Sequence, residues 1–128
     1  IGIAHAGWRG LLAGIIENTI DALIKNFDVV PKNILVVISP GIRKCHFEIS
    51  STDKEKFQEY YDFVYERESK IFVSLPDIIR VKLLNKSLMA ERIEDGALCT
   101  FCNKEEYFSY RRDKPKDVQV QVGYIGLI

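Results

Sequence analysis

Hydrophobic residues follow a helical period in the first part of the chain and form uninterrupted runs on either side of it. Between residues 10 and 27 they recur every three or four positions, which predicts an amphipathic helix. Its expected inward face consists of Leu12, Ile16, Ile20, Leu23 and Phe27. The apolar runs Ile1–Ala4 and Ile34–Ile38 predict buried strands, the second covered on both faces.

The second part of the chain mixes both patterns. Ser51 or Thr52 is expected to cap a helix over residues 53–66, with Glu55 near the position of a capping box. Residues 71–73 form a short strand or an extended linker. Pro76 then predicts the start of a helix that ends near residue 90, with an inward face of Ile78, Val81, Leu84 and Leu88.

Two strands are expected at the C-terminal end, over residues 107–112 and 118–128, joined by the polar turn 113–117. The alternation of valine and glutamine from Val118 to Val122 indicates a strand with one face in water. Helices and strands are mixed throughout, so the pattern predicts one α/β or α+β domain over residues 1–128.

Composition narrows the possible partners. The chain has 18 basic and 18 acidic residues, so no net charge attracts nucleic acid or an anionic membrane. No apolar run reaches the ~20 residues that cross a bilayer, and no signal peptide is visible. Three cysteines without a secretory context predict reduced thiols and a cytoplasmic protein. Since Ile1 opens a predicted strand, we expect the chain to be the C-terminal piece of a longer protein.

The segment His5-Ala6-Gly7-Trp8-Arg9-Gly10 is the first candidate site, because it lies between a predicted strand and a helix. His5 is either a metal ligand or a core histidine bound to backbone. Gly7 and Gly10 let the backbone approach a ligand closely. Arg9, expected at the start of the helix, suits a phosphate or carboxylate, or else forms a surface ion pair.

Three cysteines form the second candidate. Cys99 and Cys102 make a CxxC pair, and Cys45 with His46 could complete a Cys3His zinc site. The long separation between the two pairs matches no particular ligand pattern. Ordinary buried or surface thiols are therefore the favoured reading, ahead of a structural zinc site and then a redox site.

The third candidate is the segment Phe108-Ser109-Tyr110-Arg111-Arg112-Asp113. On a strand, Arg111 and Arg112 point to opposite faces, so one at most faces a given site. Asp113 could orient either arginine. An exposed strand end with a simple ion pair is the alternative.

Together these segments resemble the YfiH-like family. The resemblance rests on residues 5–10, on Ser39-Pro40-Gly41-Ile42 followed by Cys45-His46-Phe47-Glu48, on Cys99-Thr100, and on residues 108–113. The family carries the older label multicopper polyphenol oxidase or laccase-like, and is now described as purine nucleoside phosphorylases with adenosine deaminase activity. It implies a full-length protein about twice this size, with a four-layer α/β/β/α fold, mixed sheets and an N-terminal half that this chain lacks.

The resemblance also implies a zinc ion held by two histidines and one cysteine. His5 corresponds to one histidine, and the other two ligands lie upstream in the family, in Val-His-Gly and Asp-Cys segments. Cys45, Cys99 and Cys102 are therefore not expected to be that cysteine. His5, Arg9 and Arg111 are the implied catalytic residues. The implied contacts to a purine nucleoside (adenosine, inosine or a guanosine type) and phosphate come from Gly7, Trp8, Arg9, Arg111, Arg112 and Asp113.

The sequence departs from the family pattern at two places. Arg43-Lys44 stands where the family tends to have Gly-Pro, and Pro115-Lys116-Asp117 replaces a usual Gly-Arg. These differences concern substrate contacts more than the metal site. Two alternatives remain: a copper-dependent polyphenol oxidase, disfavoured because the chain has only two histidines, and a non-catalytic zinc-binding module that uses the cysteines.

Overall fold

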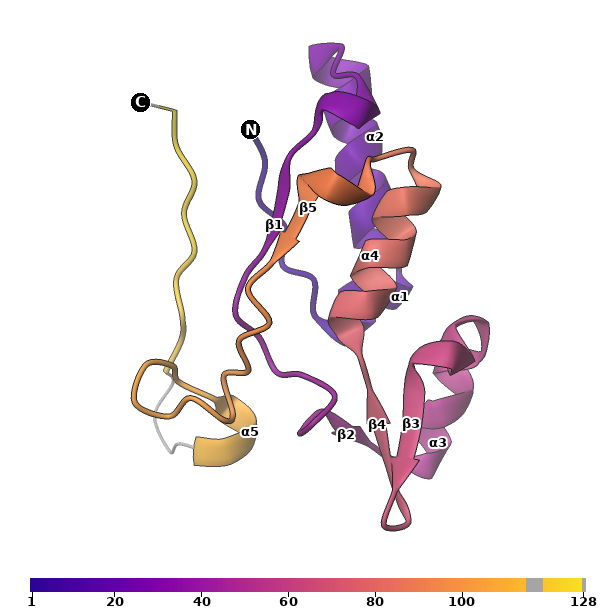
Figure 1. Cartoon of the computed structure of the whole chain (residues 1–128), viewed down its shortest axis with the longest axis vertical. Coiled ribbons are helices and arrows are strands. Elements are labelled where there is room, and N and C mark those ends of the chain that lie inside the picture. The colour runs from indigo at the N-terminus through magenta and orange to yellow at the C-terminus, as the bar shows by residue number, and fades with distance from the viewer. Residues whose placement is uncertain (115–118, 128) are drawn as a thin grey trace.

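The computed structural model of the chain describes residues 1–114 and 119–127 and contains two small sheets with helices beside them (Figure 1). A parallel pair is formed by β1 (Val36–Ile38) and β5 (Ile93–Asp95). An antiparallel sheet in the order β2-β4-β3 is formed by β2 (Glu48–Ile49), β4 (Lys70–Val73) and β3 (Val64–Arg67). Parallel and antiparallel pairs mixed with helices confirm the α+β class.

In Figure 1, the long helices lie on one side of the parallel pair, and shorter helical turns lie beside the outer strand of the antiparallel sheet. The α-helices are α1 (Trp8–Leu12), α2 (Ile15–Phe27), α3 (Ser51–Lys54), α4 (Leu75–Asn85) and α5 (Tyr110–Asp113). The 3-10 helices are η1 (Pro31–Asn33), η2 (Glu55–Phe63) and η3 (Ala90–Arg92).

The core lies where α1, α2, α4 and η2 meet. Its side chains are Leu11, Ile16, Ile20, Phe47, Phe57, Val73, Leu75, Ile78, Ile79, Leu83, Leu88 and Ile93. Beside the core, Lys82 of α4 is buried and forms an ion pair with Glu17 of α2. The pair joins the two helices that flank the N-terminal motif.

The helix predicted over residues 10–27 is two helices. Gly14 has a φ of 85°, a left-handed conformation that glycine adopts without a Cβ clash, and it separates α1 from α2. The break turns the helix face, so Leu11 is fully buried while Phe27 is 69% exposed. Ile16 and Ile20 are buried as predicted.

The helix predicted over residues 53–66 is also broken. Its cap is Ser50, whose hydroxyl accepts a hydrogen bond from the Asp53 N–H at 3.1 Å. Four α-helical residues are followed by 3-10 turns with non-helical backbone at Phe57 and Tyr60, because Phe57 is drawn into the core. The 71–73 segment is a strand, and α4 ends at Asn85 rather than near residue 90.

The predicted outer strands are the main errors. Residues 1–4 form no strand, and Ile1 and Ile3 are each 66% exposed. Only residues 36–38 of the second run form a strand, and Val37 is 67% exposed, because no element of the described chain packs on the face that carries it. One face of this strand is therefore open, contrary to the expectation of burial on both.

The C-terminal hairpin is also absent from the described residues. Tyr110–Asp113 is one helical turn, α5, instead of the end of a strand. Residues 119–127 form no strand, and Val120 and Val122 are 71% and 82% exposed. Val118, Ile128 and most of the expected turn lie outside the described residues.

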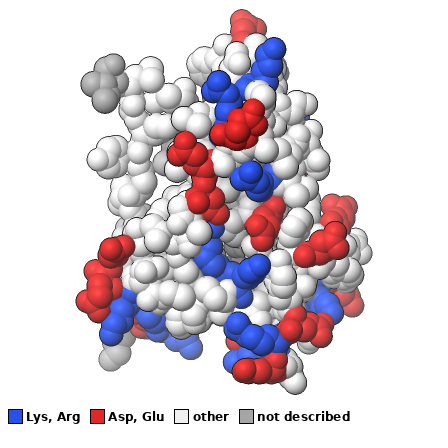
Figure 2. Space-filling view, in the orientation of Figure 1, with Lys and Arg blue, Asp and Glu red and all other residues white. Residues whose placement is uncertain are grey.

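Charges of both signs are interspersed over the face shown in Figure 2, in agreement with the balanced composition. Among residues 1–114 and 119–127, no helix combines the length and the apolar character that a bilayer crossing requires.

Candidate functional site

His5 lies in the exposed segment that leads into α1. Among the described residues, no hydrogen bond or ion pair engages its imidazole, so this side chain is not a satisfied core histidine. Its ring lies over Gly7: a Cβ on residue 7 would stand 2.9 Å from His5 Nε2. Gly7 has ordinary extended backbone, with φ −65° and ψ 158°, so it is needed here for the close approach of the ring rather than for backbone freedom.

Trp8 and Arg9 begin α1, so Arg9 lies inside a five-residue helix instead of before a long one. The Arg9 guanidinium lies 4.4 Å from the centroid of the Trp8 ring, and the Lys56 ammonium lies 5.3 Å from it. The same ring packs against the ring of Phe57 in the core, with the two ring centroids 6.2 Å apart. Trp8 thus anchors the turn to the core, while Arg9 remains exposed.

Arg112 is held by the protein itself. Its guanidinium donates hydrogen bonds to the carbonyls of Thr100 at 2.7 Å, Phe101 at 2.9 Å and Tyr107 at 2.8 Å. It also forms a two-pronged ion pair with Asp113, at 2.6 and 2.8 Å. These contacts use the full donor set of a guanidinium.

Asp113 closes the turn that carries these arginines. Its carboxylate accepts the Ser109 N–H at 3.0 Å, and this bond with the Arg112 ion pair lowers the pKa of Asp113. The local hydrogen bond favours a helical turn over the predicted strand.

Arg111 points to a different part of the chain. Its guanidinium donates one hydrogen bond, to the carbonyl of Glu48 in β2 at 2.8 Å, and lies 5.6 Å from the Phe47 ring. It is exposed, and its other donors bond to no residue in the described part of the chain, which leaves them available for a ligand. No hydrogen bond or ion pair within the described ranges links the His5 segment with Arg111 or Arg112.

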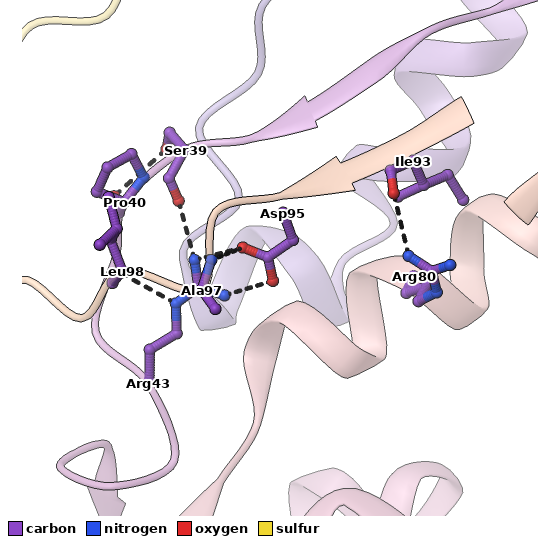
Figure 3. A network of polar contacts seen from close by, with 8 residues as sticks. All are labelled: Ser39, Pro40, Arg43, Arg80, Ile93, Asp95, Ala97 and Leu98. Carbon is purple, nitrogen blue, oxygen red and sulfur yellow. Dashed lines mark hydrogen bonds and ion pairs between the residues drawn. The ribbon is translucent and has the colours of Figure 1, made fainter. Parts of the chain in front are cut away.

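A polar network joins the loops that follow β1 and β5 (Figure 3). Arg43 and Asp95 form a two-pronged ion pair with both contacts at 2.7 Å, and Arg43 also donates to the carbonyl of Leu98 at 3.1 Å. The Ala97 N–H donates to Asp95 at 2.9 Å. Burial acts to raise the pKa of Asp95, but Arg43 and the Ala97 N–H outweigh it and lower that pKa.

Nothing in the sequence pattern singled out Asp95. In the sequence, Arg43 stands out only as a departure from the family pattern, whereas the structure shows it bonded to Asp95 and Leu98.

The same two loops bring four potential metal ligands together. Cys45, His46, Cys99 and Cys102 each offer one ligand atom, and these atoms all lie within 4.8 Å of one another. Cys45 Sγ lies 3.5 Å from Cys99 Sγ and 3.8 Å from Cys102 Sγ, and Cys102 Sγ lies 3.4 Å from His46 Nδ1. This group could hold a metal ion, so the reading of the cysteines as unrelated thiols does not describe their arrangement.

The thiols influence one another. Burial, together with the sulfurs of Cys99 and Cys102, raises the pKa of Cys45 to about 12. Burial also acts to raise the pKa of Cys99, but backbone hydrogen bonds from Arg43, Cys102 and Phe101 lower it overall. Cys99 is therefore the sulfur at which backbone N–H groups favour a thiolate.

Known proteins are similar to this chain in sequence and in fold. The family described as multi-copper polyphenol oxidoreductase laccase matches residues 1–127. Purine nucleoside phosphorylase YfiH of Escherichia coli is 34% identical over 118 residues, which are 89% of this chain and 46% of that protein. Purine nucleoside phosphorylase LACC1 of Mus musculus is 27% identical over 98% of this chain and 30% of its own length.

The crystal structure of the Bacillus licheniformis hypothetical protein YfiH superposes on this chain with a TM-score of 0.79 at 29% identity. The match covers 87% of this chain and 44% of that one. The resemblance to the YfiH-like family is confirmed, and the chain spans less than half the length of the relatives it matches.

Proposed function

Because the chain belongs to the multi-copper polyphenol oxidoreductase laccase family, we propose that it supplies the C-terminal half of a zinc-dependent purine nucleoside phosphorylase. Two of its relatives bear the name purine nucleoside phosphorylase. The substrates proposed are adenosine, inosine and guanosine-type nucleosides with phosphate, and deamination of adenosine is the second proposed activity.

The observation that carries this proposal is the state of His5. Its imidazole is exposed, is bound to no described residue, and lies over a glycine that leaves room for it. This fits a metal ligand, whose ring nitrogen must be free. A catalytic zinc has three protein ligands. We propose that His5 supplies one and that the other half of the family fold supplies the other two, as the resemblance implies.

Exposed apolar side chains support a partner for this half. Ile1, Ile3, Leu35 and Val37 are each at least 60% exposed, and Val37 belongs to a strand with one open face. An uncovered face of this kind is costly in water unless another layer packs on it. We propose that the other half of the family fold covers it, and brings the remaining zinc ligands to His5.

The arginines divide into holders of substrate and supports. Arg9 and Arg111 are exposed and retain free donors, which suits them to phosphate. Arg112 and Asp113 are bonded to each other and to backbone, so we assign them to positioning Arg111 on its turn. Trp8 fixes the turn after His5 and presents Arg9. Zinc, when bound, would supply a water whose pKa is lowered toward about 7 for attack on the purine.

The family's description names copper, and a copper polyphenol oxidase is the alternative. Multicopper sites require many imidazoles. The chain has two histidines, and His46 already lies among three cysteines. The donor set therefore favours zinc at His5.

The test is an assay of the complete protein that contains this chain. Adenosine and inosine are supplied with and without phosphate, and free base, sugar phosphate and ammonia are measured. We expect phosphate-dependent release of base from inosine and release of ammonia from adenosine. A zinc-loaded protein that forms no product from either nucleoside would contradict the proposal, and copper-dependent oxidation of a phenol would favour the alternative.

A further inference from the structure

No hydrogen bond or ion pair among the described residues links His5 to the cluster of Cys45, His46, Cys99 and Cys102, and the proposed function uses none of these four side chains. From the geometry of the cluster, we propose that these four side chains form a second metal site, a structural zinc site of the Cys3His type. The site would bind one tetrahedral Zn²⁺ and lock together the loops that follow β1 and β5.

Three of the six distances between the ligand atoms are close to those around a zinc ion. With Zn–S near 2.3 Å and Zn–N near 2.05 Å, a tetrahedron has edges of about 3.8 Å between sulfurs and about 3.5 Å between sulfur and nitrogen. The observed separations are 3.5 and 3.8 Å between sulfurs and 3.4 Å from sulfur to nitrogen. All four ligand atoms lie within 4.8 Å of one another, so the pairs outside these three need to close by about 1 Å at most to surround one ion.

Parallel strand pairing explains why distant residues converge. Ile38, the last residue of β1, is in register with Asp95, the last residue of β5, so the two segments leave the sheet at the same end of the strands. A bridge between Gly41 and Cys99 continues the pairing beyond the strands. Cys45 and Cys99 are thereby brought to the same end of the parallel strands, although their separation in the sequence matches no known ligand pattern.

Contacts outside the cluster hold its ligands in place. The His46 ring is stacked on Phe101, with centroids 3.9 Å apart and planes 14° from parallel, which orients Nδ1 toward Cys102. Arg112 binds the carbonyls of Thr100 and Phe101, between the two cysteines of the CxxC pair. Partners of this kind orient ligands in known metal sites and maintain affinity.

The burial, number and kind of the ligands indicate the type of site. Cys99 is buried, Cys45 and His46 are half-buried, and Cys102 is exposed, so an ion has an entry path to a largely covered position. Four protein ligands leave no open position for water or substrate, which is the arrangement of structural zinc. Three thiolates with one imidazole are a donor set typical of zinc.

A disulfide is the competing chemistry. The sulfur separations of 3.5 and 3.8 Å greatly exceed the bonded distance of about 2.05 Å. A disulfide would also join two sulfurs and leave the third beside His46 without a partner. The convergence of all four groups is explained by an ion and not by one S–S bond.

The test compares the two histidines and the most accessible cysteine. The complete protein is purified under reducing conditions, and zinc content and thiol reactivity are measured for wild type, His5→Ala, His46→Ala and Cys102→Ser. We expect the wild type to hold zinc that shields all three thiols. Cys102→Ser, whose exposed side chain makes misfolding the least concern, should weaken zinc binding at this site by more than the about 10–100-fold that loss of an outer partner costs.

His5→Ala is the matched control, because it removes the other histidine and leaves the cluster intact. It should keep the thiols shielded by zinc even if the nucleoside activity is lost, so the two proposals fail separately. Titration of the zinc-free protein with Co²⁺ should give a thiolate-to-cobalt absorption band that weakens in Cys102→Ser and persists in His5→Ala. Equal shielding of the remaining thiols in Cys102→Ser and wild type, or a disulfide among these cysteines in zinc-supplied protein, would overturn the proposal.

Discussion

The His5 turn and the cysteine cluster are both potential metal sites, but they are organised in opposite ways. The turn offers one exposed candidate ligand in a recognisable six-residue string, and we propose that the other ligands of its site come from the other half of the family fold. The cluster offers four ligands within 4.8 Å of one another, drawn from parts of the sequence with no recognisable spacing. The comparison teaches that a strong motif marks a site, whereas completeness depends on which segments the fold brings together.

The largest effect is expected at His5. In the complete protein, His5→Ala should lower nucleoside activity by more than about 100-fold, because loss of a ligand costs more than loss of an outer partner. Initial rates with inosine and phosphate measure this. His46→Ala is the paired variant: it should keep the activity at temperatures where it is folded. If both variants lose activity equally while folded, the two sites are not independent.

The next effect separates the two neighbouring arginines. Arg112→Ala removes the donors to three carbonyls and should lower the urea midpoint clearly, because three partly buried acceptors lose their partners. Arg111→Ala removes one hydrogen bond to Glu48 and should leave the midpoint nearly unchanged while raising the KM for phosphate. The opposite ranking in denaturation experiments would reject the assignment of Arg112 as a support.

Asp95 tests the network that supports the cluster. Asp95→Asn should cost about 1–3 kcal/mol of unfolding free energy, because Arg43 loses a carboxylate in a largely covered position. Glu94→Gln, an exposed neighbour on the same strand, should cost little.

The difference in unfolding free energy between wild type and Asp95→Asn should become smaller as the pH is lowered. The pKa of Asp95 is lowered in the folded chain, so its stabilisation is complete above its ordinary pKa near 3.9 and is lost as pH falls through the folded value. Urea unfolding of wild type and Asp95→Asn should therefore converge as the pH is taken below about 4. A difference that grows in acid would contradict the ion pair.

The smallest effect concerns the glycine beneath His5. Gly7→Ala keeps an allowed backbone but places a Cβ 2.9 Å from Nε2, so the imidazole must move. We expect activity of the complete protein to fall about 10-fold, as for loss of an outer partner, with little change in the melting temperature. Gly2→Ala, where a Cβ would make ordinary contacts with Leu23, is the control. Equal activity of both variants would show that the ring position does not matter.

Short-range sequence patterns predicted the structure correctly where no competing local contact changes the backbone. The periodicity of Ile16 and Ile20 gave the buried face of α2, and Pro76 marked the start of α4. These patterns failed where two backbone conformations are possible for the same segment. Gly14 was not recognised as a break, and Asp113 folds the two arginines into a helical turn by capping the Ser109 N–H. Outer strands were predicted from apolar runs, but a strand forms only where a neighbour supplies hydrogen bonds.

By itself, the sequence determined the family and the helices with a clear apolar face, and it marked His5 as a candidate, because these depend on residue identity and short spacing. Only the tertiary structure decided that Arg112 is bonded to three backbone carbonyls, that Arg111 bonds to the Glu48 carbonyl instead, and that Cys45, His46, Cys99 and Cys102 converge. The physical reason is that parallel pairing of β1 and β5 joins residues far apart in the chain, and no local pattern records which strands pair.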